Sequence, residues 1–235
     1  MIKQQLHIAL VEDEINIAEN YRDALQRIGY RVSLFHNRQE ALATFSTVLP
    51  DMAIIDVGLQ HEYEGGFDLC RTLRQLSETL PIIFLTARDS ELDEISALRL
   101  GADDYLTKDV SIHQVLARVA ALFRRIQALQ QPASATEQVI NRGSLRINVE
   151  RIETYWQDQL VMLTLTEFWI VHTLARHPGQ VKNREQLMDA AHVVLDNNTI
   201  TTHIKRIRKK FNAIDTEFNA IKTAYGMGYR WVIES

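Results

Sequence analysis

The stretch Met52-Ala53-Ile54-Ile55-Asp56 is a short apolar run that ends in a carboxylate, and it decides how the first half of the chain folds. Two further apolar runs, at 8–11 and 82–85, and a short segment near 104–107 also end in a polar or charged side chain. The side chains at the four ends are Glu12 with Asp13, Asp56, Thr86 and Lys108. Because ligands bind outside the carboxyl ends of the strands in an open parallel sheet, we expect these side chains to converge on one pocket.

Strand-like and helix-like segments alternate over the first 125 residues. Apolar side chains recur at helical spacing within 15–28, and Gly29 follows as a stop signal. A second strand-like run lies at 31–35. Further helical segments are expected at 37–48, 67–77, 90–100 and 112–126. Five such units predict an α/β domain with a five-stranded parallel (βα)5 sheet that helices cover on both faces.

The composition describes an ordinary globular protein. The chain has 235 residues, of which 46% are hydrophobic and 24% charged. No apolar stretch approaches the roughly 20 residues that span a membrane, and the first residues run straight into a strand, so we expect neither a membrane contact nor a signal peptide. The single cysteine, Cys70, excludes an internal disulfide and fits a reducing compartment. We therefore expect a cytoplasmic protein.

The charge divides the chain into two parts. Residues 1–138 carry 13 Lys and Arg against 20 Asp and Glu, a net charge of −7, while residues 139–235 carry 13 against 10, a net charge of +3. An acidic first part and a basic second part predict two domains with different partners. We expect domains at 1–126 and 139–235, joined by a linker at 127–138 that is rich in Gln, Ala, Ser and Thr.

The second part has the pattern of a compact α+β domain. Strand-like runs lie near 144–149, 152–156 and 160–163, and helical segments follow at 166–177, 184–191 and 198–211. The chain then closes with a hairpin at 221–232 that turns at two glycines.

The pocket in the first part has the ligand chemistry of a divalent cation. Mg²⁺ prefers hard oxygen ligands and uses one or two carboxylates. Asp13 and Asp56 would supply these, with Glu12 acting through water and the backbone carbonyl of Gly58 as a further oxygen. Such a cation neutralises charge while a carboxylate attacks a phosphoryl group. Acids at strand ends are often inert, but four suitable side chains on one sheet favour a functional site, with Lys108 and Thr86 binding phosphoryl oxygens.

The helical segment at 198–211 combines an apolar stripe with a dense basic cluster. Its apolar residues, spaced 4, 3 and 4 apart, are Ile200, Ile204, Ile207 and Phe211. The other faces carry Thr199, Thr202, His203, Lys205, Arg206, Arg208, Lys209 and Lys210. A charged face is often only solvated, but this one lies in the basic part beside a glycine-tipped hairpin. It predicts a helix that binds double-stranded DNA in the major groove.

Residues 8–14, 52–56, 84–89 and 101–108 resemble the receiver domain of two-component response regulators, a likeness that covers about residues 5–125. The resemblance implies a flavodoxin-like fold in which Asp56 accepts a phosphoryl group from a sensor histidine kinase, with Mg²⁺ required. It also implies that Thr86 and Tyr105 form the switch. Two features depart from the family pattern. Asp109 replaces the usual proline after Lys108, and the loop 58–66 lacks proline and is about two residues longer.

Residues 140–235 resemble the winged helix-turn-helix effector domain of the OmpR/PhoB type, through the stretches 163–168, 177–181, 198–211 and 223–229. The resemblance implies that 198–211 is the recognition helix, with His203 and Arg206 as candidates for contacts to base edges. The terminal hairpin would be the wing, with Thr223 and Tyr225 near DNA, although the family usually has arginine at the position of Tyr225. The segment 190–197 is about three residues short of the loop that contacts RNA polymerase in relatives.

Together the two resemblances imply a phosphorylation-controlled transcription factor rather than an enzyme. Phosphorylation is expected to promote a homodimer, in which Asp103 pairs with Arg118 and Asp104 with Arg125, and the dimer would bind directly repeated half-sites roughly 10 base pairs apart. In having Asp109 after Lys108 and a long loop after Asp56, the chain also resembles regulators that are encoded with dedicated sortase systems in proteobacteria.

Two alternatives stay open at this point. One is a phosphorylation-independent winged-helix transcription factor whose receiver serves only for dimerisation. The other is a doubly wound phosphohydrolase, against which Gly58 argues, because haloacid-dehalogenase-type enzymes have a second aspartate there. The sequence names neither the kinase, nor the operator, nor the sign of regulation.

Overall fold

The structure is a computed structural model that describes residues 5–59, 62–130, 139–190 and 197–233. Its chain divides into two compact units, Met1–Val119 and Ala120–Ser235. The division falls within one long helix, α5 (Ile112–Gln130), which continues past the predicted boundary at 126. The exact domain boundaries and the linker therefore stay predictions.

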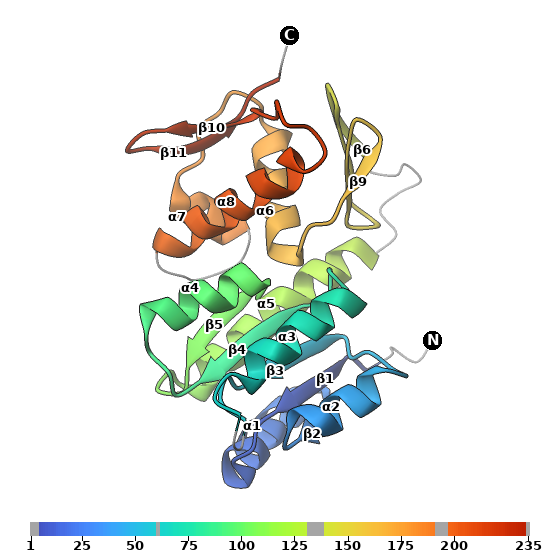
Figure 1. The fold of residues 1–235 in the computed structure, drawn as a ribbon, viewed down its shortest axis with the longest axis vertical. Helices are drawn as coiled ribbons and strands as arrows, with labels where there is room; N and C mark the ends of the chain where they lie inside the picture. The colour runs from blue at the N-terminus through green and yellow to red at the C-terminus, as the bar shows by residue number, and fades with distance from the viewer. Residues whose placement is uncertain (1–4, 60–61, 131–138, 191–196, 234–235) are drawn as a thin grey trace. The chain divides into compact units, whose positions relative to one another are not determined.

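The first unit is the α/β domain expected from the sequence. Its strands are β1 (His7–Val11), β2 (Arg31–Phe35), β3 (Met52–Ile55), β4 (Ile82–Thr86) and β5 (Asp104–Thr107). They form one parallel sheet in the order β2-β1-β3-β4-β5 (Figure 1). The residues of β1, β3 and β4 are all buried, as in a sheet covered on both faces.

The helices of the first unit alternate with these strands. They are α1 (Ile15–Arg27), α2 (Arg38–Phe45), α3 (Gly65–Leu76), α4 (Glu91–Leu100) and α5. Local signals mark several ends: Asn37 caps α2, Ser90 caps α4, and Gly101 ends α4 in the left-handed conformation. The strand order reverses between β1 and β3, and right-handed crossovers then place helices on opposite faces. This reversal is where such sheets bind ligands.

The second unit has two antiparallel sheets around three helices. The first sheet contains β6 (Val139–Arg142), β7 (Leu145–Asn148), β8 (Glu153–Trp156) and β9 (Gln159–Val161). The helices α6 (Leu165–Arg176), α7 (Arg184–Ala190) and α8 (Asn197–Asn212) follow, and β10 (Ile221–Ala224) and β11 (Gly228–Trp231) form the terminal hairpin (Figure 1). This is the expected winged-helix architecture, with one more strand than the sequence predicted. β6 was not predicted from the sequence because the turn between β6 and β7 contains one glycine, Gly143, in the left-handed conformation, and no longer run of turn-forming residues marks it.

Aromatic rings join the sheets and helices of the second unit. Trp156 of β8 lies edge-on to Phe211 of α8 and Phe218, with ring centroids 5.7 and 5.0 Å apart. Trp231 of β11 contacts the same cluster, 6.2 Å from Trp156. The apolar side of α8 is therefore anchored from both sheets, which fixes the helix that carries the basic cluster.

Candidate functional site

Three carboxylates meet where the strand order reverses. Glu12 and Asp13 follow β1, Asp56 follows β3, and one oxygen of each lies within 4.8 Å of the others. Glu12 and Asp56 are buried, while Asp13 is half-buried. Their meeting, expected from the pattern of strand ends, is confirmed by the structure.

Lys108 reaches into this cluster from the end of β5. Its Nζ donates to Oδ2 of Asp56 at 2.7 Å and to Oε1 of Glu12 at 2.8 Å. The backbone N–H of Lys108 also donates to the carbonyl of Thr86, at 2.7 Å. Asp109, which stands in place of the usual proline, accepts a hydrogen bond from the hydroxyl of Thr107. The unusual turn thus still brings the ammonium group to Asp56.

The charges in the pocket are strongly coupled. Burial raises the pKa of Glu12 to about 7, and the nearby charge of Asp56 adds to this, while the hydrogen bond from Lys108 opposes it. Burial would lower the pKa of Lys108, but its bonds to Asp56 and Glu12 outweigh that effect and raise it. The pocket thus holds one ammonium among three acids, and a further cation would relieve the remaining negative charge.

The donor set fits a divalent cation such as Mg²⁺. Three carboxylate oxygens within 4.8 Å of one another offer the hard ligands that Mg²⁺ prefers, and Asp13 is half-buried rather than enclosed. Gly58, expected to offer its backbone carbonyl, lies two residues after Asp56, and a Cβ added there would meet no atom within 4 Å.

The two expected switch residues lie on neighbouring strands. Thr86 is buried at the end of β4, and its Oγ1 accepts from the backbone N–H of Arg88 at 3.4 Å. The Tyr105 hydroxyl donates to the carbonyl of Arg88 at 2.8 Å, and burial raises the pKa of Tyr105 above its usual value. Both residues therefore contact the same short segment after β4.

The long loop after Asp56 is folded back on itself. Leu59 and Glu62 exchange two backbone hydrogen bonds, of 3.1 and 2.9 Å. The two glycines that the sequence placed in the loop instead begin α3. A Cβ on Gly66 would lie 1.9 Å from the carbonyl oxygen of Asp56, so glycine alone permits this approach.

Two arginines contact the described residues of this loop. The Nε of Arg38 lies 2.7 Å from Oε2 of Glu62. The guanidinium of Arg88 forms an ion pair with Asp93 at 2.8 Å and stacks on the ring of Tyr63, 4.2 Å from its centroid. Sequence reasoning missed both arginines, since neither belongs to a strand end or a periodic stripe.

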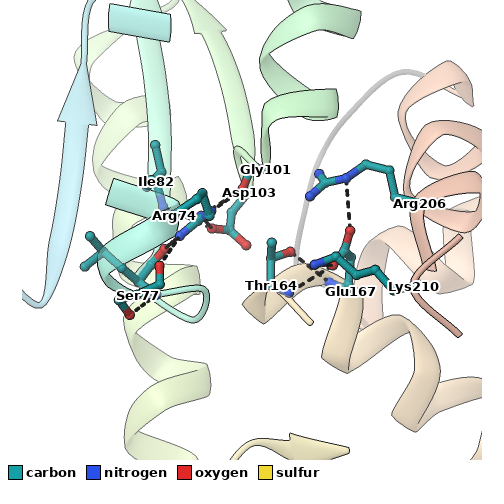
Figure 2. A network of polar contacts seen from close by, with 10 residues as sticks. Arg74, Ser77, Ile82, Gly101, Asp103, Thr164, Glu167, Arg206 and Lys210 are labelled. Atoms are coloured by element: carbon teal, nitrogen blue, oxygen red, sulfur yellow. Dashed lines mark hydrogen bonds and ion pairs between the residues drawn. The ribbon is translucent and has the colours of Figure 1, made fainter. Parts of the chain in front are cut away.

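The residues expected at a dimer interface are placed differently from the prediction. Asp103 is buried, and its carboxylate accepts from the backbone N–H of Ile82 at 3.0 Å and from Arg74 at 3.1 Å (Figure 2). Arg118, expected to pair with Asp103 of a second copy, lies 3.3 Å from Asp104 of its own chain. The prediction overlooked that Asp103 is needed to bind a backbone group at the start of β4. The side chain of Arg125 lies outside the described residues.

The apolar stripe of α8 is confirmed, since Ile200, Ile204, Ile207 and Phe211 are all buried. The basic residues divide into distinct groups. Lys205 and Lys209, four residues apart, are exposed. Arg208 donates to the carbonyl of Ile221 at 2.9 Å and to Oγ1 of Thr223 at 3.0 Å, which ties α8 to β10.

The side chains of the two residues expected to contact base edges are not freely exposed on the helix. His203 is buried, and Arg206 is directed toward Glu167 of α6, with its Nε 3.2 Å from Oε1. Lys210 binds the same carboxylate at 2.9 Å. The spacing of residues along α8 predicts which side chains share a face of the helix. It does not predict that Glu167 of α6 lies beside two of them.

The remaining predicted residues lie around these groups. Thr202 is half-buried, and Tyr225 is 92% exposed at the tip of the terminal hairpin. The side chain of Thr199 lies outside the described residues, as do residues 191–196 of the segment 190–197 that was compared with the polymerase-contacting loop of relatives. Within the part of the chain that the structure describes, no helix is long and apolar enough to cross a membrane.

Both units match known families. Residues 8–120 match the family described as "Response regulator receiver domain", and residues 158–231 match "Transcriptional regulatory protein, C terminal". Among curated proteins, the transcriptional regulatory protein CreB of Escherichia coli K12 is 39% identical over 96% of this chain and 97% of its own length. The transcriptional regulatory protein BaeR of Escherichia coli O6:H1 is 35% identical over 95% and 92%.

Solved structures give the same result. A mutant form of RitR is 26% identical and superposes with a TM-score of 0.75, covering 97% of this chain and 100% of that one. DrrB of Thermotoga maritima, described as an OmpR/PhoB homolog, is 26% identical with the same coverage and a TM-score of 0.52.

Proposed function

This chain belongs to the OmpR/PhoB family of response regulators, DNA-binding proteins that control transcription, and we propose that phosphorylation of Asp56 regulates it. The observation that carries the proposal is the pair of contacts from Lys108 Nζ, which reaches Asp56 at 2.7 Å and Glu12 at 2.8 Å. An ammonium held against one carboxylate in a cluster of three is suited to bind the oxygens of an incoming phosphoryl group.

The phosphoryl donor is the phosphohistidine of a sensor histidine kinase. An oxygen of Asp56 forms the new O–P bond while the P–N bond breaks, and the imidazole leaves with the bonding electrons. Asp13, Asp56 and the carbonyl of Gly58 would hold Mg²⁺, with Glu12 acting through water. When bound, the cation neutralises charge on the phosphoryl oxygens. Lys108 binds one of these oxygens, and the hydroxyl of Thr86 donates to another.

The segment after β4 transmits the change. Thr86 bonds the backbone N–H of Arg88, and Tyr105 bonds the carbonyl of the same residue. When Thr86 turns to the phosphoryl group, the segment around Arg88 shifts and the Tyr105 ring moves inward. This alters the surface made by α4, β5 and α5.

That altered surface promotes a homodimer, which binds directly repeated half-sites through α8 and the terminal hairpin. Asp103 is bound to Arg74 and is therefore not available for an ion pair between two copies. Asp104 and Arg118, which pair within one chain, would instead exchange this contact for ion pairs across the dimer interface. Contact with RNA polymerase, the cytoplasmic location and the narrower likeness to sortase-associated regulators stay predictions.

The test is treatment of the full chain with acetyl phosphate and Mg²⁺. Intact-mass spectrometry should show one added phosphoryl group in wild type and none in Asp56→Asn, while Asp158→Asn, at a 94% exposed side chain, should behave as wild type. Light scattering should then show a dimer only in the phosphorylated samples. Equal phosphorylation of Asp56→Asn would refute the assigned acceptor. Phosphorylation without dimerisation or tighter DNA binding would instead favour the phosphorylation-independent regulator.

A further inference from the structure

The carboxylate of Glu167 is buried at the start of α6 and binds two of the five basic residues of α8 (Figure 2). Oε1 lies 3.2 Å from Nε of Arg206, and Oε2 accepts a hydrogen bond from Nζ of Lys210 at 2.9 Å. Arg206 and Lys210 are four residues apart and therefore share one side of the helix. Only 15% and 26% of their side-chain surfaces are exposed.

Glu167 is itself held by the local structure of α6. Its Oε2 also accepts from the backbone N–H of Thr164 at 2.9 Å, which completes a capping box at the start of the helix. Burial alone would raise the pKa of Glu167, but the cations of Arg206 and Lys210 outweigh burial and lower it. The carboxylate is therefore ionised at neutral pH and attracts both cations.

The neighbouring side of α8 contrasts with this arrangement. Lys205 and Lys209 also lie four residues apart, and both are exposed. They can bind DNA phosphates without giving up a buried ion pair, whereas Arg206 and Lys210 would have to leave Glu167. Because a buried carboxylate without its cations is strongly unfavourable, the two pairs of basic residues differ in how readily they bind DNA.

We propose that Glu167 is a specificity-determining residue of the DNA-binding unit: it holds Arg206 and Lys210 against α6 and so keeps two cations of α8 away from DNA phosphates. Contacts to phosphates contribute to binding on any sequence, and each one adds to the salt dependence of the affinity. With two cations withheld, non-specific binding is weaker and base contacts decide more of the affinity. The inference rests on the proposed assignment of α8 as the helix that binds DNA.

The salt dependence of binding to a fluorescent duplex of arbitrary sequence tests this directly. Each phosphate contact contributes about 0.9 to the slope of log K against log salt. In the full chain, Lys205→Met should make the slope shallower by about 0.9, whereas Lys210→Met should leave it unchanged. Glu167→Gln keeps the amide oxygen for the capping box but removes the charge. It should steepen the slope by up to about 1.8, an additional loss of about 12-fold in affinity between 50 and 200 mM salt.

A double substitution and a matched control complete the test. Lys210→Met introduced into Glu167→Gln should now make the slope shallower, because the lysine has been released. Glu150→Gln, at an exposed position, changes the net charge equally and should leave the slope unchanged.

The outcomes separate the two assignments. If Lys205→Met and Lys209→Met have no effect, α8 is not the helix that binds DNA. If they act as expected but Lys210→Met in the wild-type chain lowers the slope equally, α8 is correct and the role of Glu167 is refuted. This comparison does not need the Glu167→Gln variant to fold.

Discussion

The guanidinium of Arg88 stacks on the ring of Tyr63, 4.2 Å from its centroid, and so joins the loop that follows Asp56 to the segment that follows Thr86. Nη2 of Arg88 also donates to the Tyr63 hydroxyl at 3.0 Å, and the carbonyl of Arg88 accepts from Tyr105. Arg88 therefore contacts both the loop that follows Asp56 and Tyr105.

Removal of the Tyr63 ring should destabilise the first unit modestly. Tyr63→Ala loses the cation–π contact at an exposed site and should lower the free energy of unfolding by about 1 kcal/mol, measured by urea denaturation with far-UV circular dichroism. Tyr63→Phe keeps the stacked ring and should lose less. Tyr225→Ala, which deletes a 92% exposed tyrosine, serves as the control and should have no effect. Unchanged stability in Tyr63→Ala would mean that the stacked pair contributes nothing.

The approach of Gly66 to Asp56 predicts a severe effect of one methyl group. In Gly66→Ala the new Cβ would lie 1.9 Å from the carbonyl oxygen of Asp56, so the backbone of the acceptor must shift. We expect a loss of about 3 kcal/mol in unfolding free energy and slower labelling by acetyl phosphate. The matched variant Gly58→Ala meets no atom within 4 Å and should stay within about 0.5 kcal/mol of wild type. Similar stabilities for the two variants would contradict the packing described.

Lys108 balances the buried acids, and its removal should make stability depend on a divalent cation. In Lys108→Met, Glu12 and Asp56 lose a cation at 2.8 and 2.7 Å, which should cost on the order of 3 kcal/mol without metal. Addition of Mg²⁺ should then stabilise the variant more than it stabilises wild type, because binding to the folded state alone shifts the unfolding equilibrium. Differential scanning calorimetry with and without Mg²⁺ measures this, with the exposed Lys209→Met as control. An equal response of both proteins to Mg²⁺ would refute the prediction.

His172 gives the second unit a pH-dependent stability. Burial, with the charges of Arg176 and His177, lowers the pKa of His172 from 6.5 to about 4. Between these values the unfolded chain binds a proton that the folded state does not bind, so stability is full above pH 6.5 and falls as the pH drops toward 4. The loss is at most about 3 kcal/mol.

The measurement can use the intrinsic fluorescence of the second unit, because all three tryptophans lie there, at Trp156, Trp169 and Trp231. Urea titrations between pH 4 and 7 should show a weaker pH dependence in His172→Phe, which keeps an aromatic ring beside Phe168. His113→Gln, an exposed position on α5, is the control. The same pH dependence in His172→Phe and wild type would exclude this histidine as the cause.

Several features were predictable because they depend on neighbours in the sequence. The apolar run that ends at Asp56, and its counterparts at Glu12, Thr86 and Lys108, predicted parallel strands whose ends meet, and the pocket is found there. The 4-3-4 spacing from Ile200 to Phe211 likewise predicted the buried side of α8. Residue spacing predicts which side chains share a face of a helix or strand, because the periodicity of each element is fixed.

Other features depended on partners that are distant in the sequence. Asp103 was expected on a dimer surface but binds the backbone of Ile82, 21 residues away. Arg206 was expected at base edges but lies against Glu167, 39 positions earlier in the chain. In both cases the residue type and its place in the secondary structure were predictable from the sequence. The sequence did not show which group lies opposite the side chain in the folded protein.

The sequence by itself therefore determined the two domain types, the chemical groups of the acidic pocket and the side of α8 that is buried, because periodicity and strand ends are local properties. Only the tertiary structure decided which charges are committed to buried partners and which face solvent. The physical reason is that an ionised side chain in the interior needs an opposite charge or a hydrogen-bonding group beside it, and folding alone places that group.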